Sequence, residues 1–140
     1  FYESVVPEMK IIYDAAYPLL ANSQAALVTS GTATLETAAI GTPQVVCYRA
    51  NGSKLSYKLF EHILKVRFVS LPNLIADKEV VPELLLHLCN PDNIAAHLAP
   101  LLADSPERSA MLDGYKTVRQ RLGSNDSAET AARQLIADLK

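Results

Sequence analysis

The pattern that most constrains the fold is an apolar run that leads through a helical pattern into a second apolar run. Residues 25–29 (AALVT) and 44–48 (QVVCY) are short and apolar, as buried strands are. Residues 32–40 between them have helical spacing, and Gly41 and Pro43 follow where a helix should end. A strand, a helix and a second strand at this spacing predict a parallel βαβ unit.

Further elements are predicted on both sides of this unit. Residues 9–13 (MKIIY) are predicted to form a strand and residues 15–21 a short helix. Residues 53–66 are predicted to form a helix, and residues 68–71 a fourth strand that Pro72 stops. Because the strands are continuously apolar, helices should cover both faces of the sheet. The expected fold is α/β, a Rossmann-like doubly wound parallel sheet followed by C-terminal helices.

The second half of the chain is predicted to be helical. Asn90-Pro91 and Ser105-Pro106 each combine an N-cap residue with a proline suited to the first helical turn. Asp126 and Glu129 have the spacing of a capping box. We expect residues 1–122 to form one domain. Residues 123–140 should form a helix that docks on that domain, on a missing N-terminal domain or on a partner subunit.

Composition narrows the class of protein. The chain has 140 residues, of which 49% are hydrophobic and 20% charged, enough for one domain with a core. A formal net charge of -2 gives no general signature of nucleic-acid binding, so no nucleic-acid partner is expected. Because the chain begins at Phe1, we expect it to be part of a longer protein. Cys47 and Cys89 are too few for a disulfide scaffold, which favours a reducing, cytoplasmic setting.

The turn at Ser30-Gly31-Thr32 is the strongest candidate for a binding site. It joins the end of a predicted parallel strand to the start of a helix, and ligands of open α/β sheets bind at that edge. The free N–H groups of residues 32–35 and the helix dipole favour an anion there. Gly31 allows a phosphate close to the backbone, and Ser30, Thr32 and Thr34 add hydroxyl donors.

Two charged residues lie within reach of this turn. Glu36 follows Thr32 by one helical turn, and its carboxylate could accept hydrogen bonds from ribose hydroxyls. Arg49 follows a strand at the same sheet edge and could reach a diphosphate. Each feature also has a plain structural interpretation, because such turns cap many helices and an early Glu suits the dipole. The three histidines have no metal-binding spacing, so no metal site is expected.

Several motifs in a fixed order resemble one known family. They are SGTATLE at residues 30–36, GTPQVV at 41–46, YR at 48–49, VSLPNLIA at 69–76 and VVPELL at 80–85. Their order and spacing, from about residue 8 to residue 103, are similar to the C-terminal part of lipid-A-disaccharide synthase. That resemblance implies one half of a two-domain GT-B glycosyltransferase.

The resemblance also implies an activity. The full enzyme would transfer a diacylated glucosamine from its UDP-linked donor to diacylglucosamine 1-phosphate, at the inner-membrane surface and without a cofactor. The C-terminal domain would hold the UDP, whereas the general base and much of the acyl-chain site would lie on the N-terminal domain. This chain alone should therefore bind and not catalyse. A homo-oligomer is compatible with the apolar last helix.

The matching positions assign candidate site residues. The diphosphate is expected at Ser30, Gly31, Thr32, Ala33 and Thr34, the ribose at Glu36, and the rest of the cleft at Arg49 and Asn73. The family often has Ala where this chain has Thr34. By its position after Pro72 alone, Asn73 would be a turn residue with a local role.

Two other functions remain open. A phosphosugar isomerase or related sugar-phosphate binder would use the same Ser/Thr-rich turn, with little preference for uridine, but leaves VSLPNLIA unexplained. A non-catalytic α/β interaction module would use Ser30 only as a helix cap and would bind no small ligand.

Overall fold

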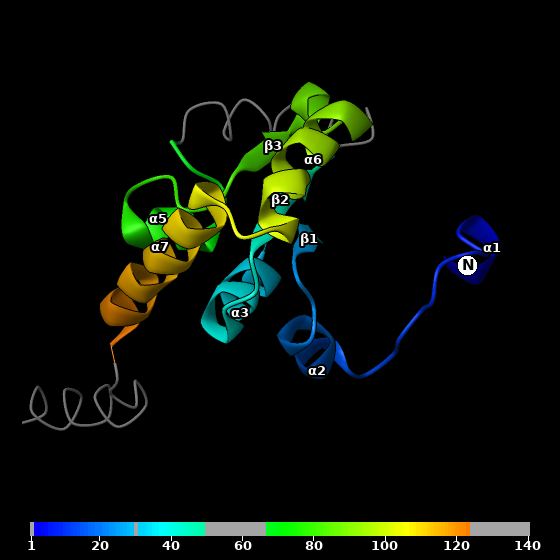
Figure 1. Cartoon of the computed structure of the whole chain (residues 1–140), viewed down its shortest axis with the longest axis horizontal. Helices are drawn as coiled ribbons and strands as arrows, with labels where there is room; N and C mark the ends of the chain where they lie inside the picture. Colours follow the sequence, from blue (N-terminus) through cyan, green and yellow to red (C-terminus); the bar gives the residue numbers. More distant parts are fainter. Residues whose placement is uncertain (1, 30, 50–66, 124–140) are drawn as a thin grey trace, which may run out of the picture.

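A computed structural model describes residues 2–29, 31–49 and 67–123 (Figure 1). The helices are α1 (Tyr2–Val5), α2 (Ala16–Ala21), α3 (Thr32–Ile40), α5 (Leu71–Ala76), α6 (Pro91–Leu98) and α7 (Pro106–Leu122). The strands are β1 (Ala26–Thr29), β2 (Gln44–Tyr48) and β3 (Glu83–Leu85). Two 3-10 turns, η1 (Leu86–Leu88) and η2 (Ala99–Leu102), complete the order. The helix predicted over residues 53–66 and the capping box at Asp126 lie outside the described residues.

The three strands form one parallel sheet in the order β1-β2-β3. Leu27 pairs with Val45, and Val46 pairs with Glu83. The βαβ unit of β1, α3 and β2 is therefore confirmed, and with it the α/β class. Gly41 ends α3 in the left-handed region, at φ 99°, where a side chain would be strained.

Two predicted strands are wrong. Residues 9–13 form neither helix nor strand, and the side chains of Met9 and Tyr13 are 68% and 63% exposed. Figure 1 shows this stretch between α2 and the outlying α1, away from the sheet, so no strand in the described part of the chain lies beside it to satisfy its backbone. Residues 68–71 are not a strand either, because α5 begins at Leu71. Pro72 lies in the first turn of α5, where its missing N–H costs nothing.

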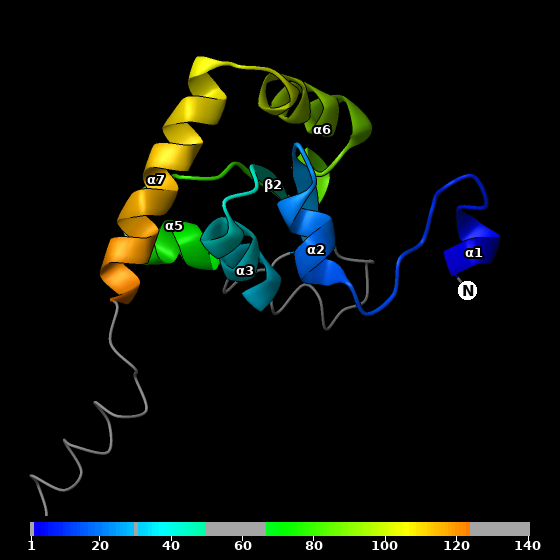
Figure 2. The same ribbon diagram turned by 60° about the horizontal axis from the view of Figure 1, so that its bottom comes forward.

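The second half confirms both predicted helix starts. The side chain of Asn90 accepts a hydrogen bond from Asn93 N at 2.9 Å, and Ser105 Oγ accepts one from Arg108 N at 3.0 Å. Figure 2 shows the long helix α7 beside α3 and α5, and α7 packs against both. The helix α6 packs against β2.

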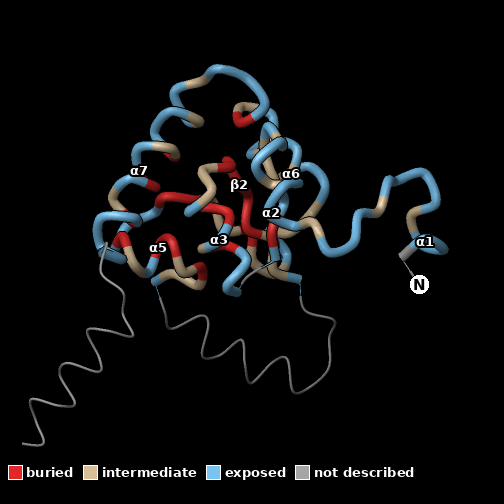
Figure 3. Tube along the Cα trace, turned by 90° about the horizontal axis from the view of Figure 1, so that it is seen from below, coloured by how far each residue is buried: buried red, intermediate tan, exposed pale blue. Residues whose placement is uncertain are grey.

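Tyr115 anchors α7 to the βαβ unit. Its side chain is fully buried, and its hydroxyl donates to Thr42 O at 3.1 Å. The same hydroxyl accepts from Gln44 Nε2 at 3.2 Å, and Nε2 also donates to Thr34 O at 2.9 Å. Figure 3 shows β2 and the inner faces of α5 and α7 as the buried centre of the chain. The core thus holds α3, β2 and α7 in fixed relation, and this positions the start of α3.

Candidate functional site

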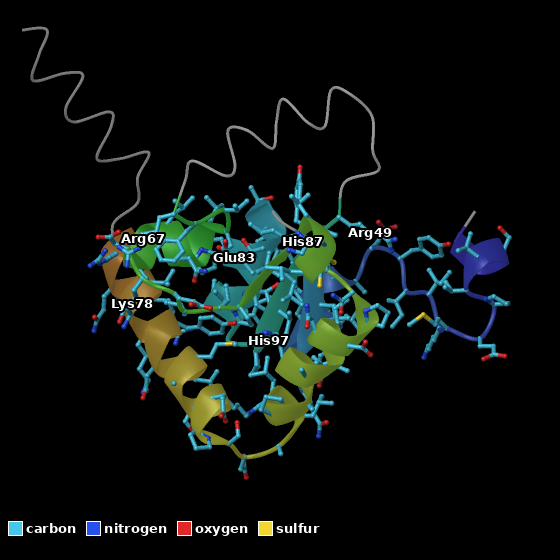
Figure 4. All side chains as sticks on the ribbon, turned by 90° about the horizontal axis from the view of Figure 1, so that it is seen from above. Arg49, Arg67, Lys78, Glu83, His87 and His97 are labelled. Carbon is cyan, nitrogen blue, oxygen red and sulfur yellow. The ribbon has the colours of Figure 1, made fainter. Side chains whose placement is uncertain are left out.

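The carboxyl ends of the three strands share one edge of the sheet. Thr29 pairs with Cys47, and Tyr48 pairs with Leu85, so β1, β2 and β3 end close to one another. The start of α3 follows β1, Arg49 follows β2, and η1 follows β3. Figure 4 shows Arg49, His87, Glu83 and Arg67 along one side of the molecule. This is the edge at which open α/β sheets bind ligands.

The start of α3 is open to solvent at this edge. Gly31, Thr32 and Ala33 are exposed, and among the described residues, chain neighbours aside, no heavy atom lies within 4 Å of a Cβ built at Gly31. Gly31 has φ 139° and ψ −162°, a conformation that is essentially restricted to glycine. Thr34 N donates to Gly31 O at 3.2 Å, whereas the N–H groups before it have no acceptor within the helix and lie at the positive end of its dipole. The backbone here offers a site for an anionic group. Ser30 lies outside the described residues.

Thr34 faces the interior instead of the edge. Its side chain is fully buried, and Thr34 Oγ1 donates to Gly31 O at 2.7 Å. The hydroxyl proton is therefore used within the turn. A contact between Thr34 and a diphosphate stays a prediction, but the geometry gives Thr34 the role of fixing the conformation of Gly31.

Glu36 and Arg49 both remain accessible. Glu36 lies on the exposed face of α3, one turn beyond Thr32. Arg49 is exposed directly after β2, at the same edge. Both side chains are thus free to meet a ligand at this edge, since a carboxylate can accept hydrogen bonds from hydroxyl groups and a guanidinium can pair with a phosphate.

Asn73 is buried in α5 with its amide group fully engaged. Asn73 Oδ1 accepts from Val80 N at 2.7 Å and from Val81 N at 2.9 Å. Asn73 Nδ2 donates to Val81 O and to Glu83 Oε1, each at 2.9 Å. These four bonds use the hydrogen-bonding capacity of the amide. The predicted ligand contact at Asn73 is untested, and in this conformation its side chain instead fixes the turn that leads into β3.

Glu83 is a residue that the sequence analysis did not single out. Its carboxylate accepts hydrogen bonds from Ser70 N at 2.8 Å, from Ser70 Oγ at 2.6 Å and from Val69 N at 2.9 Å. Ser70 precedes α5 without capping it through its own side chain, so Glu83 satisfies backbone donors there. The sequence did contain a signal for this role, because Glu83 is the single acid within the apolar stretch from Val80 to Leu88. Glu83 and Asn73 together join α5 to β3 at the site edge.

Among the described residues, no group of three or more His, Cys, Asp and Glu side chains could hold a metal ion. None of the helices within those residues is long and apolar enough to cross a membrane.

Comparison with known proteins decides the family. A sequence model described as lipid-A-disaccharide synthetase matches residues 5–137, which is nearly the whole chain. The chain belongs to the lipid-A-disaccharide synthetase family. The open start of α3 and the turn that Asn73 holds both lie within the matched residues.

Curated members of the family share more than a third of their aligned residues with this chain. The lipid-A-disaccharide synthase of Syntrophus aciditrophicus is 38% identical over 134 residues, which cover 96% of this chain and 34% of that protein. The enzyme of the same name from Serratia proteamaculans is 37% identical, over 94% of this chain and 35% of its own length. That of Acidobacterium capsulatum is 39% identical, over 94% and 32%. The chain thus spans about a third of the length of these relatives.

Proposed function

We propose that this chain is the donor-nucleotide-binding part of a glycosyltransferase. In the full protein, the reaction is the transfer of a diacylated glucosamine from a UDP-linked donor to diacylglucosamine 1-phosphate. The observation that carries the proposal is the open start of α3 at the carboxyl edge of a parallel sheet, in a chain of the lipid-A-disaccharide synthetase family.

The diphosphate of the donor is assigned to the backbone at the start of α3. Ser30, Gly31, Thr32 and Ala33 supply N–H groups, the helix dipole and two hydroxyls, and Gly31 keeps the approach free of a side chain. Hydrogen bonds from N–H groups stabilise the charge of a phosphate without burying a charged side chain. Thr34 supports this geometry from the inside through its bond to Gly31.

The ribose and the remaining phosphate charge are assigned to side chains at the rim. Glu36 accepts hydrogen bonds from the ribose hydroxyls, which gives an acid beside a phosphate site a specific task. Arg49 lies after β2 at the same edge and balances negative charge on the diphosphate. We therefore expect uridine nucleotides with two phosphates to bind more tightly than those with one.

The chemical step belongs to the part of the protein outside this chain. The general base and the acyl-chain site are assigned to an N-terminal domain, so this chain binds nucleotide and does not turn over. Peripheral association of the full protein with the cytoplasmic face of the inner membrane belongs to the same proposal. A homo-oligomer remains an untested prediction.

The test is a titration of this chain with UDP, UMP, ADP and glucosamine 6-phosphate, followed by amide shifts in NMR spectra. We expect UDP to bind more tightly than ADP, with shifts at Gly31, Thr32 and Glu36. Glu36→Gln should weaken UDP binding about 10-fold, because losing a charge-assisted hydrogen bond costs about 1.4 kcal/mol. The exposed Glu79→Gln, on the turn before β3, is the matched control and should leave the affinity unchanged.

The other outcomes separate the alternatives. Unchanged UDP affinity in Glu36→Gln contradicts the ribose assignment. A response to glucosamine 6-phosphate alone favours a sugar-phosphate binder. If no ligand shifts any resonance, the nucleotide site assigned to this chain is wrong or incomplete without the rest of the protein, and the full-length enzyme carrying Glu36→Gln distinguishes these two cases.

A further inference from the structure

The turn that follows β3 is held in a strained conformation by its own hydrogen bonds. Leu86 has φ 57°, in the left-handed region, where a bulky side chain is strained. Cys89 N donates to Leu86 O at 3.1 Å, and Asn90 N donates to Leu88 O at 3.0 Å. Asn90 Nδ2 donates to His87 O, also at 3.0 Å. Strained backbone that the surrounding structure maintains in this way clusters at ligand-binding and active sites.

His87 is the polar side chain that this turn presents to solvent. It is exposed, and within the part of the chain that the structure describes its imidazole makes no hydrogen bond or ion pair. The fold therefore fixes the backbone of His87, through Asn90, and leaves its side chain unused. A neutral imidazole carries one donor and one acceptor, so it can form hydrogen bonds with hydroxyl groups of a ligand.

The register of the sheet places this turn beside the exit of β2. Tyr48, the last residue of β2, pairs with Leu85, the last residue of β3. Arg49 and His87 follow these paired ends directly, on neighbouring strands. Figure 4 shows His87 between Glu83 and Arg49 on the same side of the molecule. Since neighbouring strands lie about 4.8 Å apart, the end of β3 is only about 10 Å from the end of β1.

The order of the strands gives the direction in which a nucleotide sugar extends along this edge. The inference rests on the proposed function, in which Glu36 on α3 holds the ribose, and the start of α3 and Arg49 hold the diphosphate. The path from ribose to diphosphate thus leads from β1 toward β2. In a UDP-linked sugar the next group is the sugar on the second phosphate, and the next strand of the sheet is β3.

We propose that the turn after β3 is the sugar subsite of this chain, and that His87 forms a hydrogen bond with a hydroxyl group of the donor sugar. The left-handed Leu86 and the bond from Asn90 fix the backbone of His87 before the ligand arrives. Less conformational entropy is then lost on binding. The start of α3 provides the affinity for the nucleotide, and the turn after β3 adds the affinity for the sugar.

The test compares UDP-N-acetylglucosamine, a soluble UDP-linked sugar, with UDP in NMR titrations of this chain. The chain has three histidines, so single substitutions can assign their imidazole resonances. We expect UDP-N-acetylglucosamine to shift the imidazole resonances of His87, and UDP to leave them nearly in place. His87→Ala should weaken binding of UDP-N-acetylglucosamine about 5-fold and binding of UDP less than about 2-fold, because only the hydrogen bond to the sugar is lost.

His97→Ala is the matched control for His87→Ala. His97 is also an exposed histidine, but it lies on α6 and lines a hollow together with Pro82, which precedes β3 at the opposite, amino end of that strand. We expect His97→Ala to leave both affinities unchanged, and the imidazole resonances of His97 to stay in place with either nucleotide.

The contrary outcomes separate this inference from the proposed function. If UDP-N-acetylglucosamine shifts the amides of Gly31 and Thr32 but not the imidazole of His87, the sugar subsite is wrong and the nucleotide site is retained. Equal losses of affinity for both nucleotides in His87→Ala would also overturn the inference, because His87 would then not distinguish the sugar. If neither nucleotide shifts Gly31 or His87, in this chain and in the full-length protein, both proposals are wrong.

Discussion

Asn73 shows how one buried side chain can replace a stretch of backbone hydrogen bonding. Its amide serves Val80 N, Val81 N and Val81 O, all in the turn before β3. In Asn73→Ala these groups lose their partners, and buried polar groups without partners are expensive. We expect the free energy of unfolding to fall by about 3 kcal/mol, measured by urea denaturation followed by circular dichroism.

Asn22→Ala provides the control for that measurement. Asn22 Nδ2 also donates to a backbone carbonyl, Pro18 O, at 2.8 Å, but this bond is exposed. Its loss should cost less than about 1 kcal/mol, because water replaces the partner. Equal losses in both variants would contradict the structural role given to Asn73.

Tyr115 gives the chain a pH dependence at the alkaline end. Burial raises the pKa of its phenol well above the ordinary value near 10, and the hydrogen bonds from Gln44 offset only part of this. The unfolded chain releases this proton above about pH 10, whereas the folded chain keeps it. The contribution of Tyr115 to the free energy of unfolding is therefore fully present below about pH 10, and it is lost as the pH rises further.

The variant Tyr115→Phe isolates this dependence. It removes the bonds to Thr42 O and Gln44 Nε2 and should cost about 1 kcal/mol at pH 7. Between about pH 10 and 11.5, its urea midpoint should fall less steeply than that of the parent chain. Tyr17→Phe, at a 60% exposed position, should leave the slope unchanged. If the urea midpoints of the parent chain and of Tyr115→Phe fell equally steeply with pH, the assignment of this pH dependence to Tyr115 would be wrong.

Among the elements, α7 depends on a glycine in its middle. A Cβ at Gly114 would lie 2.5 Å from Cγ1 of Val80, which belongs to the buried core. Alanine gains about 1 kcal/mol of helix propensity over glycine. Forcing a methyl group into this contact costs about 2 to 3 kcal/mol. We therefore expect Gly114→Ala to lower the unfolding free energy by about 1 to 2 kcal/mol.

A double-mutant cycle with Val80→Ala tests the cause of that loss. Val80→Ala removes both methyl groups that a new side chain at Gly114 would meet. In that background, Gly114→Ala should be neutral or stabilising, so the coupling between the two positions should be favourable. Additive losses would show that the clash does not control the effect.

The short elements at the site edge were harder to predict than the long helices. Ser70 and Glu83 show why, because a carboxylate from β3 supplies the hydrogen bonds that begin α5. No local pattern near residues 68–71 contains that information. The strand predicted over residues 9–13 was wrong for the opposite reason. Its local sequence pattern favours a strand, but none of the strands that the structure describes lies beside it.

At the scale of the whole molecule, β1 is the exposed feature of the sheet. Within the described part of the chain, β1 pairs on one side only, and Leu27 on it is 50% exposed. An apolar groove runs beside it, lined by residues of α2, β1 and α3. Unprotected apolar edge strands promote association. We expect this chain by itself to self-associate as its concentration rises, measured by sedimentation velocity.

Leu27→Lys should reduce that association, because a charge on an edge strand opposes pairing with another strand. The matched control is Leu74→Lys on α5, where the leucine is also 50% exposed. Both variants should keep the parent's unfolding free energy to within about 0.5 kcal/mol, since both positions are surface positions. Equal loss of association in the two variants would show that general charge, and not the β1 edge, is responsible.

The sequence by itself determined the elements whose signals are local. Apolar periodicity and Gly41 defined β1, α3 and β2, and the Asn-Pro and Ser-Pro pairs defined the starts of α6 and α7. The same motifs placed an open helix start at the carboxyl edge of the sheet. Tertiary structure decided the rest, because long-range partners control it. Asn73 and Thr34 turn inward and make hydrogen bonds with backbone groups, and the carboxylate of Glu83 on β3 accepts hydrogen bonds from the backbone at which α5 begins.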